Sequence, residues 1–295
     1  MDRRYTRQRL DEVLRRTCVR LGMDHRDATL LRFTNNAVYS LAREPVVVRI
    51  VGSRALGHRA GKVVQVARYL AEHGVPAVRL FDGVPQPLVV DEYVVTVWHR
   101  VHVVRRTATS AELARLLRLV HSLPPPGDVP AWAPLSDVRA RVADAEELAA
   151  DDRRFLLQRC AEVEERLREL EFVLPPSLVH GDAHPGNVIV GEDGPVLCDF
   201  DSSCVGPPEW DLIPLAVGRT RFRDPPGLYG ELARHYGFDV TEWDGFAVLR
   251  AARELKLTTS VLPIARSQPV VRRELARRLG DLREGRTAGR WFRYR

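Results

Sequence analysis

Apolar residues recur every three or four positions near the start of the chain, at Leu10, Val13, Leu14, Cys18 and Leu21. Arginines of the same stretch fall between these positions and turn toward water. A periodicity near 3.6 residues is typical of an amphipathic helix with one face on a core. The pattern predicts a helix over residues 6–22.

The pattern then changes to short runs rich in β-branched and aromatic residues, separated by turn residues. One stretch with helical spacing, residues 55–73, interrupts these runs and ends at Gly74. The first hundred residues therefore predict a small antiparallel sheet packed on one helix. The predicted strands are residues 29–33, 38–42, 46–51, 77–81 and 88–101.

Helical spacing dominates after residue 100. The exception is a pair of short apolar runs, Val188 to Val190 and Val196 to Cys198, joined by a turn with Asp193-Gly194, the usual signal of a β-hairpin. The expected fold class is α+β, with a small N-terminal antiparallel sheet plus helix and a larger, mostly helical C-terminal part. The predicted helices are residues 110–121, 136–149, 152–171, 212–218, 227–237, 242–262 and 269–284.

The predicted hairpin gathers polar side chains at one end. Asn187 precedes its first strand and Asp199 follows its second, so the turn folds them back together. Asp182 lies five residues before Asn187, on the loop that enters the first strand. Phosphoryl transfer needs such a set, with one carboxylate to orient the attacking hydroxyl and an amide plus a carboxylate to hold Mg²⁺. A polar loop without chemistry is the alternative.

The order His180-Gly181-Asp182, followed by Asn187 and Asp199, resembles the motif of the aminoglycoside phosphotransferase and choline kinase family, whose members are kinase-like phosphotransferases. The resemblance implies that Asp182 is the catalytic carboxylate and that Asn187 and Asp199 bind Mg²⁺. It also implies that ATP is the phosphate donor, with GTP as an open alternative.

The same resemblance implies a bilobal, protein-kinase-like fold. Residues 1–100 would form the nucleotide-binding lobe, and residues 101–295 the catalytic and substrate-binding lobe. In the family, backbone groups after the last strand of the first lobe bind the adenine edge, a position that falls near His99 and Val101. A backbone contact leaves no side-chain signal, so the register stays open.

Arg49 lies inside the apolar run Val46 to Val51. An arginine there is costly to bury unless it meets an anion, and kinases need a fixed cation on this strand for the α- and β-phosphates. Arg49 is predicted to be that cation, and an exposed arginine on an edge strand is the alternative. The helix over 55–73 has no interior glutamate to pair with it, so Asp199 or the phosphates are expected to orient Arg49.

The turn expected to cover the nucleotide, residues 33–39, contains no glycine. Asn36 and neighbouring backbone amides are therefore expected to meet the phosphates, in place of a glycine-rich cradle. An ordinary hairpin turn is an equal alternative.

Three further carboxylates stand out. By the resemblance, Asp211 accepts hydrogen bonds from the backbone of the Asp182 loop. Asp201 could touch a metal or substrate, and a solvated loop carboxylate is an equal alternative. Glu254 could face the substrate, and a salt bridge to Arg250 or Lys256 is the simpler expectation. The arginine-rich end of the chain is expected to be a solvated helix face and a frayed tail.

Composition narrows the function further. The chain has 295 residues with ordinary globular proportions, four cysteines without metal spacing, and no apolar run long enough for a membrane span. Residues 1–7 lead into no signal core, so a soluble cytoplasmic protein with free thiols is expected.

The net charge of +6 lies in residues 1–100, with 17 Lys and Arg against 10 Asp and Glu, whereas the remainder has 28 against 29. No basic tract interleaved with aromatics supports nucleic-acid binding.

The expected function is a kinase for a hydroxyl of a small molecule. The acceptor could be an antibiotic, such as an aminoglycoside or a nucleoside-type compound, which would make the chain an antibiotic resistance enzyme, or it could be a sugar or amino-alcohol metabolite. The neutral second part counts against a polycationic aminoglycoside. A weak pseudokinase or nucleotide-binding regulator is the alternative, and oligomeric state is open.

Overall fold

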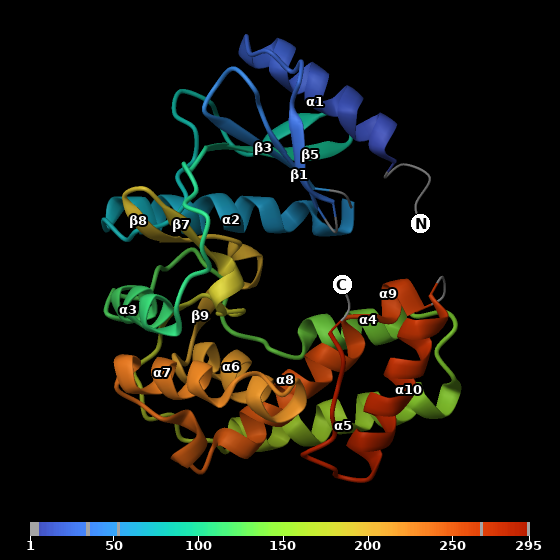
Figure 1. Ribbon diagram of the computed structural model, residues 1–295. Helices are drawn as coiled ribbons and strands as arrows, with labels where there is room; N and C mark the ends of the chain where they lie inside the picture. Colours follow the sequence, from blue (N-terminus) through green and yellow to red (C-terminus); the bar gives the residue numbers. More distant parts are fainter. Residues whose placement is uncertain (1–5, 34–35, 52–53, 266–267, 294–295) are drawn as a thin grey trace. The chain divides into compact units, whose positions relative to one another are not determined.

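Figure 1 shows a computed structural model, which describes residues 6–33, 36–51, 54–265 and 268–293. Two compact units are interleaved along the sequence. The first comprises Met1–Ala108, Leu123–Pro130 and Pro185–Cys204, and the second comprises Thr109–Ser122, Ala131–His184 and Val205–Arg295. The lobe boundary expected between residues 100 and 101 stays a prediction. Two positions of the predicted nucleotide turn, 34 and 35, and the first five residues lie outside the described ranges.

A five-stranded antiparallel sheet forms the centre of the first unit, with strand order β1-β2-β3-β5-β4. The strands are β1 (Thr29–Phe33), β2 (Asn36–Ser40), β3 (Val46–Val51), β4 (Leu88–Val90) and β5 (Tyr93–His99).

One predicted strand is wrong, because residues 77–81 form only isolated bridges. The side chain of Gln86 takes the place of a neighbouring strand by bonding both the N–H and the C=O of Val97. The predicted run 88–101 is two strands, because the chain reverses at Asp91, where φ is +53°.

Two helices cover the sheet of the first unit. Helix α1 (Arg7–Leu21) begins at the N-cap Thr6 and ends at Gly22, and its apolar face packs on one face of the sheet (Figure 1). Helix α2 (Arg54–Glu72) contacts β3 and β5. Both helices confirm the predicted periodicity. The core between α1 and the sheet includes Leu10, Val13, Leu14, Cys18, Val46, Val48, Ile50, Val95 and Val97.

Arg49 lies on the sheet face opposite α1. Successive side chains of a strand point to opposite faces, and Val48 and Ile50 pack against α1. Strand β3 is flanked by β2 and β5, where Arg49 pairs with Val38 and Thr96. The alternative of an edge-strand arginine is therefore wrong.

The predicted hairpin is confirmed. Strand β7 (Val188–Gly191) pairs antiparallel with β8 (Gly194–Leu197), in a register that sets Val188 opposite Leu197. The two-residue turn agrees with the Asp-Gly signal. A short 3-10 turn, η1 (Pro185–Asn187), precedes β7, and η2 (Phe200–Ser202) follows β8.

The second unit is mostly helical and confirms the predicted helices to within a few residues at most ends. Two short strands, β6 and β9, pair with each other and were not predicted. Among the described residues, no helix has the length and apolar character that crossing a membrane requires. The elements are α3 (Ser110–His121), α4 (Ser136–Asp144), α5 (Ala150–Arg168), β6 (Ser177–Val179), β9 (Cys204–Gly206), α6 (Glu209–Arg221), α7 (Pro226–Tyr236), η3 (Val240–Glu242), α8 (Phe246–Thr259), α9 (Leu262–Ala265) and α10 (Pro269–Arg283).

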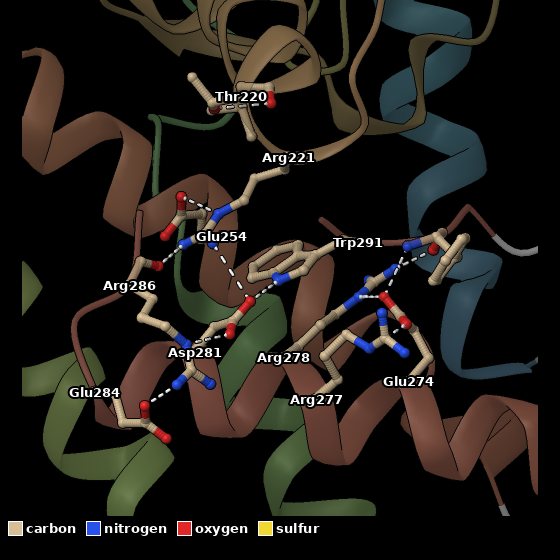
Figure 2. Close-up of polar contacts among 12 residues, drawn as sticks. Thr220, Arg221, Glu254, Glu274, Arg277, Arg278, Asp281, Glu284, Arg286 and Trp291 are labelled. Carbon is tan, nitrogen blue, oxygen red and sulfur yellow. Dashed lines mark hydrogen bonds and ion pairs between the residues drawn. The ribbon is translucent and has the colours of Figure 1, made fainter. Parts of the chain in front are cut away.

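The arginine-rich end is not a frayed tail, as Figure 2 shows. Trp291 is 1% exposed, and its indole N–H donates to Asp281 at 2.8 Å. Buried carboxylates neutralise the arginines, which is why this segment packs rather than frays. We call this group the C-terminal charge cluster: Arg221, Glu254, Glu274, Arg278, Asp281, Arg286 and Trp291.

Candidate active site

The loop from His180 to Asp182 is held by one buried carboxylate. Asp211 is fully buried at the start of α6 and accepts hydrogen bonds from the backbone N–H groups of His180, at 2.6 Å, and Gly181, at 2.7 Å. The ring of His121 lies 3.1 Å from the same carboxylate. Asp211 therefore has the structural role that the resemblance implied, and His121 is an additional partner that the sequence did not reveal.

Gly181 explains why this loop has glycine between His180 and Asp182. Its φ is +79°, in the left-handed region, which costs an L side chain energy. His180 is 3% exposed, and its Nδ1 lies 3.4 Å from the backbone nitrogen of Asp182. The two residues before Asp182 thus shape the loop.

Asp182 faces cations of its own unit. Nη2 of Arg253, on α8, donates to Oδ1 of Asp182 at 2.6 Å, and Nε2 of His184 lies 3.9 Å from Oδ2. Burial alone would raise the pKa of Asp182, but the charges of Arg253, His184 and His180 and the Arg253 hydrogen bond outweigh it. The resulting pKa is about 2, so Asp182 is ionised at neutral pH.

The hairpin brings Asn187 and Asp199 to the same end of the first unit. The N–H of Cys198 donates to the carbonyl of Asn187 at 3.0 Å, extending the β7–β8 pairing by one step toward Asp199. Asn187 is 5% exposed. Asp199 has φ +68°, a backbone conformation that is rare outside glycine and is often found at functional sites.

Asp201 supplies the partner that α2 lacks. Arg49 donates through Nη2 to Oδ2 of Asp201, and the amide of Asn36 lies 3.5 Å from the same oxygen. Lys62, on α2, donates to the backbone carbonyl of Asp201 at 2.7 Å. The expectation that Asp199 or the phosphates orient Arg49 is therefore corrected, because Asp201 performs this task and is no solvated loop carboxylate.

Asp199 and Asp201 form a carboxylate pair whose charges act on each other. Burial and the neighbouring charge of Asp201 raise the pKa of Asp199. Burial also acts to raise the pKa of Asp201, but Arg49 outweighs it and lowers that pKa. Arg32 also lies 3.3 Å from Asp199 but is 60% exposed, so its charge is screened by water, and the charge of Arg59 acts on Asp201. Carboxylate oxygens are ligands that a hard divalent cation prefers.

The residues expected near adenine are at the end of β5. The N–H of His99 donates to the carbonyl of Arg79 at 2.9 Å, so it is already occupied, and the ring of His99 meets Asp82. The N–H of Val101 makes none of the backbone–backbone bonds that the described loops and turns contain. Val101 is therefore the better candidate of the two for a backbone contact with adenine.

Sequence reasoning missed Arg32, Lys62 and Arg253. Lys62 carried a usable signal, since it is one of two lysines in the chain and lies on the helix where kinases place a glutamate. Arg253 carried none, because 71 residues separate it from Asp182. Glu254, which could have faced the substrate, instead accepts a hydrogen bond from Nε of Arg221 at 2.7 Å, and Nε of Arg250 lies 3.8 Å from the same carboxylate.

Comparison with known proteins places the chain in a family. A family model described as the phosphotransferase enzyme family matches residues 31–250. No curated protein has a significant sequence match to this chain.

Several solved structures share the fold. Amicoumacin kinase hAmiN, in complex with AMP-PNP, Ca²⁺ and Ami, has a TM-score of 0.68 at 15% identity, over 96% of this chain and 98% of that one. Choline kinase LicA from Streptococcus pneumoniae has a TM-score of 0.67 at 16% identity, over 92% and 99%. ADP-bound aminoglycoside phosphotransferase APH(2'')-Ib has 0.61 at 16% identity, over 91% and 96%. The predicted α+β, protein-kinase-like fold is confirmed.

Proposed function

The chain belongs to the phosphotransferase enzyme family, and on that premise we propose that it is a kinase that transfers the γ-phosphate of ATP to a hydroxyl of a small molecule. The observation that carries the proposal is the hairpin end, where Asn187 and Asp199 lie beside a carboxylate-paired arginine. In the reaction, a bond forms between the acceptor oxygen and the γ-phosphorus. The bond from that phosphorus to the bridging oxygen breaks, and ADP leaves.

Asp182 is proposed to orient the acceptor hydroxyl and to take its proton late, before releasing it to water. A carboxylate with a pKa of about 2 is a weak base for an alcohol. A loose transition state demands little nucleophilic push, so positioning supplies most of the rate. The fixed loop that holds Asp182 supports this role.

Asn187 and Asp199 are proposed to bind Mg²⁺ through oxygen. Their chemistry fits, since a hard cation prefers carboxylate and amide oxygens, and burial beside Asp201 disfavours the charged form of Asp199 until a cation meets it. When bound, Mg²⁺ would neutralise charge on the nucleotide phosphates. The protein contributes the left-handed backbone at Asp199 and the ladder that fixes Asn187.

Arg49 and Asn36 are proposed to contact the nucleotide phosphates, and the backbone of His99 and Val101 the adenine. Asp201 pairs with Arg49 in place of an interior glutamate of α2, which supports the kinase over the alternative of a weak pseudokinase or nucleotide-binding regulator. The relatives support ATP as donor, because hAmiN was solved with AMP-PNP and APH(2'')-Ib with ADP. GTP remains an alternative donor.

An acceptor screen that reads ADP release tests the proposal. Purified protein with Mg²⁺ and ATP should release ADP slowly alone and faster with an accepted hydroxyl compound. Asp182→Ala should lower turnover at least about 100-fold and leave ATP binding in place. Asp193→Ala, which removes an exposed carboxylate at the hairpin turn, is the matched control and should keep turnover. Turnover of Asp182→Ala within tenfold would show that the assignment is wrong.

A further inference from the structure

Helix α8 presents two cations on the side that faces Asp182. Arg253 and Lys256 are three residues apart, so their side chains lie on one helix face. Arg253 is 12% exposed and bonds Asp182 directly. The charge of Asp182 also acts on Lys256. One carboxylate therefore has two cations of the same helix near it.

Lys256 has no compensating ion pair among the described residues. Its ammonium lies 5.9 Å from the ring centre of Trp210, which offers a cation–π contact. The charge of Asp137, on α4, also acts on Lys256 and more strongly than that of Asp182, and the same carboxylate lies 4.0 Å from Arg141 of its own helix. Burial lowers the pKa of Lys256 to about 8, so it is still mostly charged at neutral pH.

Arg253 also keeps an unused donor. Its Nε is buried and makes no hydrogen bond within the described part of the chain, whereas its Nη2 is taken by Asp182. An unpaired buried donor and a partly buried charge are both costly to fold.

We propose that the acceptor is an anionic hydroxy compound, whose carboxylate or phosphate group binds Lys256 and Arg253 while its hydroxyl meets Asp182. This inference rests on the proposed kinase function. An anion would supply the missing counter-charge and accept from donors that now lack partners. A polycationic acceptor would instead bring ammonium groups against Arg253 and Lys256, and like charges repel.

The group transfer balances without a further reactant. The acceptor hydroxyl forms a new bond to the γ-phosphorus, ADP leaves, and the hydroxyl proton passes to Asp182 and then to water. The anionic group of the acceptor takes no part in bond making. Its role is to place the hydroxyl, so its loss should weaken acceptor binding.

Matched pairs of compounds test the proposal: glycerate against glycerol, gluconate against sorbitol, and glucose 6-phosphate against glucose, with kanamycin as a polycation. The first two pairs probe a carboxylate and the third a phosphate. The best acceptor by kcat/KM should be an acidic member. Lys256→Met should raise KM for it at least about tenfold, with a smaller change for its neutral partner, and Lys256→Arg should restore KM.

A second readout needs no turnover. Lys62 and Lys256 are the only lysines of the chain, so the rate at which acetic anhydride modifies Lys256, measured by mass spectrometry relative to Lys62, reports occupancy. Acidic compounds should protect Lys256 at least about fivefold more than their neutral partners. The control is Arg250→Gln, which removes the arginine three residues before Arg253 on α8 and should leave the protection of Lys256 unchanged.

Three results would overturn the inference. The first is a best acceptor that is neutral or cationic, and the second is equal protection of Lys256 by acidic and neutral compounds. The third is an equal loss of kcat for all acceptors in Lys256→Met, which would show that Lys256 acts on the transferred phosphoryl group. A wild-type protein without ATP hydrolysis would instead overturn the kinase function. The two failures are therefore distinguishable.

Discussion

Two buried groups of charges in this protein differ in how far they are neutralised. In the C-terminal charge cluster, arginines and carboxylates are paired within the protein: Arg221 with Glu254 at 2.7 Å, and Arg278 with Glu274 at 3.1 Å. Asp281 accepts from Trp291 at 2.8 Å. At the hairpin end, by contrast, Asp199 and Asp201 share the buried cation Arg49.

This difference distinguishes buried charges with a structural role from buried charges that bind a ligand. A buried charge that is paired within the chain stabilises only that arrangement. A buried charge left in excess needs a ligand, and its sign indicates which one. Asp199, whose pKa is raised by burial and by Asp201, suits a divalent cation, and the cations of α8 beside Asp182 suit an anionic acceptor.

Neutralising Asp199 should give the largest effect. Asp199→Asn keeps the shape of the side chain and removes a proposed Mg²⁺ ligand, so ADP release should fall at least about 10³-fold. Because the folded-state pKa of Asp199 is raised, its ionised form costs stability at neutral pH. The melting temperature, measured by calorimetry, should therefore stay level or rise.

The control for this experiment is Asp193→Asn at the exposed hairpin turn, which should change neither the rate of ADP release nor the melting temperature. Turnover of Asp199→Asn within tenfold of wild type would contradict the metal assignment. A large drop in melting temperature would contradict the claim that the charge of this carboxylate costs stability in the folded protein.

Neutralising a carboxylate of the C-terminal charge cluster should instead lower stability and leave the nucleotide site unchanged. Glu254→Gln leaves Arg221 with Asp281 at 3.6 Å as its nearest remaining carboxylate. Breaking a buried pair from one side should cost about 3 kcal/mol of unfolding free energy, or roughly 6–12 °C in melting temperature for a domain of this size. Below that temperature KM for ATP should not change, because Glu254 contacts no residue of the nucleotide site.

Glu165→Gln is the matched control for Glu254→Gln. Glu165 pairs with Arg168 at the surface, where the side chains are 62% and 68% exposed. Its loss should change stability by less than about 0.5 kcal/mol. Equal losses in the two variants would show that the C-terminal charge cluster is not specially coupled to folding.

The sequence predicted the elements whose signals are local. Helix α3 matched its predicted range because its periodicity is continuous and Thr109 and Glu112 form a capping box. The strand expected over 77–81 is reduced to isolated bridges, because the side chain of Gln86 accepts from the N–H of Val97 and donates to the carbonyl of Phe81, where a regular strand would pair the two backbones directly. The buried tail was missed because Trp291 is fixed by Asp281, a contact with no periodic pattern.

Among the site residues, too, only those joined by a local signal could be placed together from the sequence. Asn187 and Asp199 could be placed together because a short hairpin joins them. The partner of Arg49 could not, since Asp201 lies 152 residues away in sequence. Which residues pair over such a separation depends on the whole fold, and the residues next to Arg49 in the sequence do not reveal its partner.

The smallest predicted effect concerns Lys256 and depends on pH. Burial lowers its pKa from 10.5 to about 8, so below pH 8 the lysine is charged in both the folded and the unfolded chain, and its full desolvation cost destabilises the fold. Between about pH 8 and 10.5 the unfolded chain binds more protons, so unfolding free energy rises with pH, and above 10.5 the cost is gone. Lys256→Met should therefore be more stable than wild type by about 1–3 kcal/mol at pH 7. Urea unfolding at pH 7, 9 and 10.5 should show this advantage shrinking, and a constant difference would mean that Lys256 is well solvated or already paired.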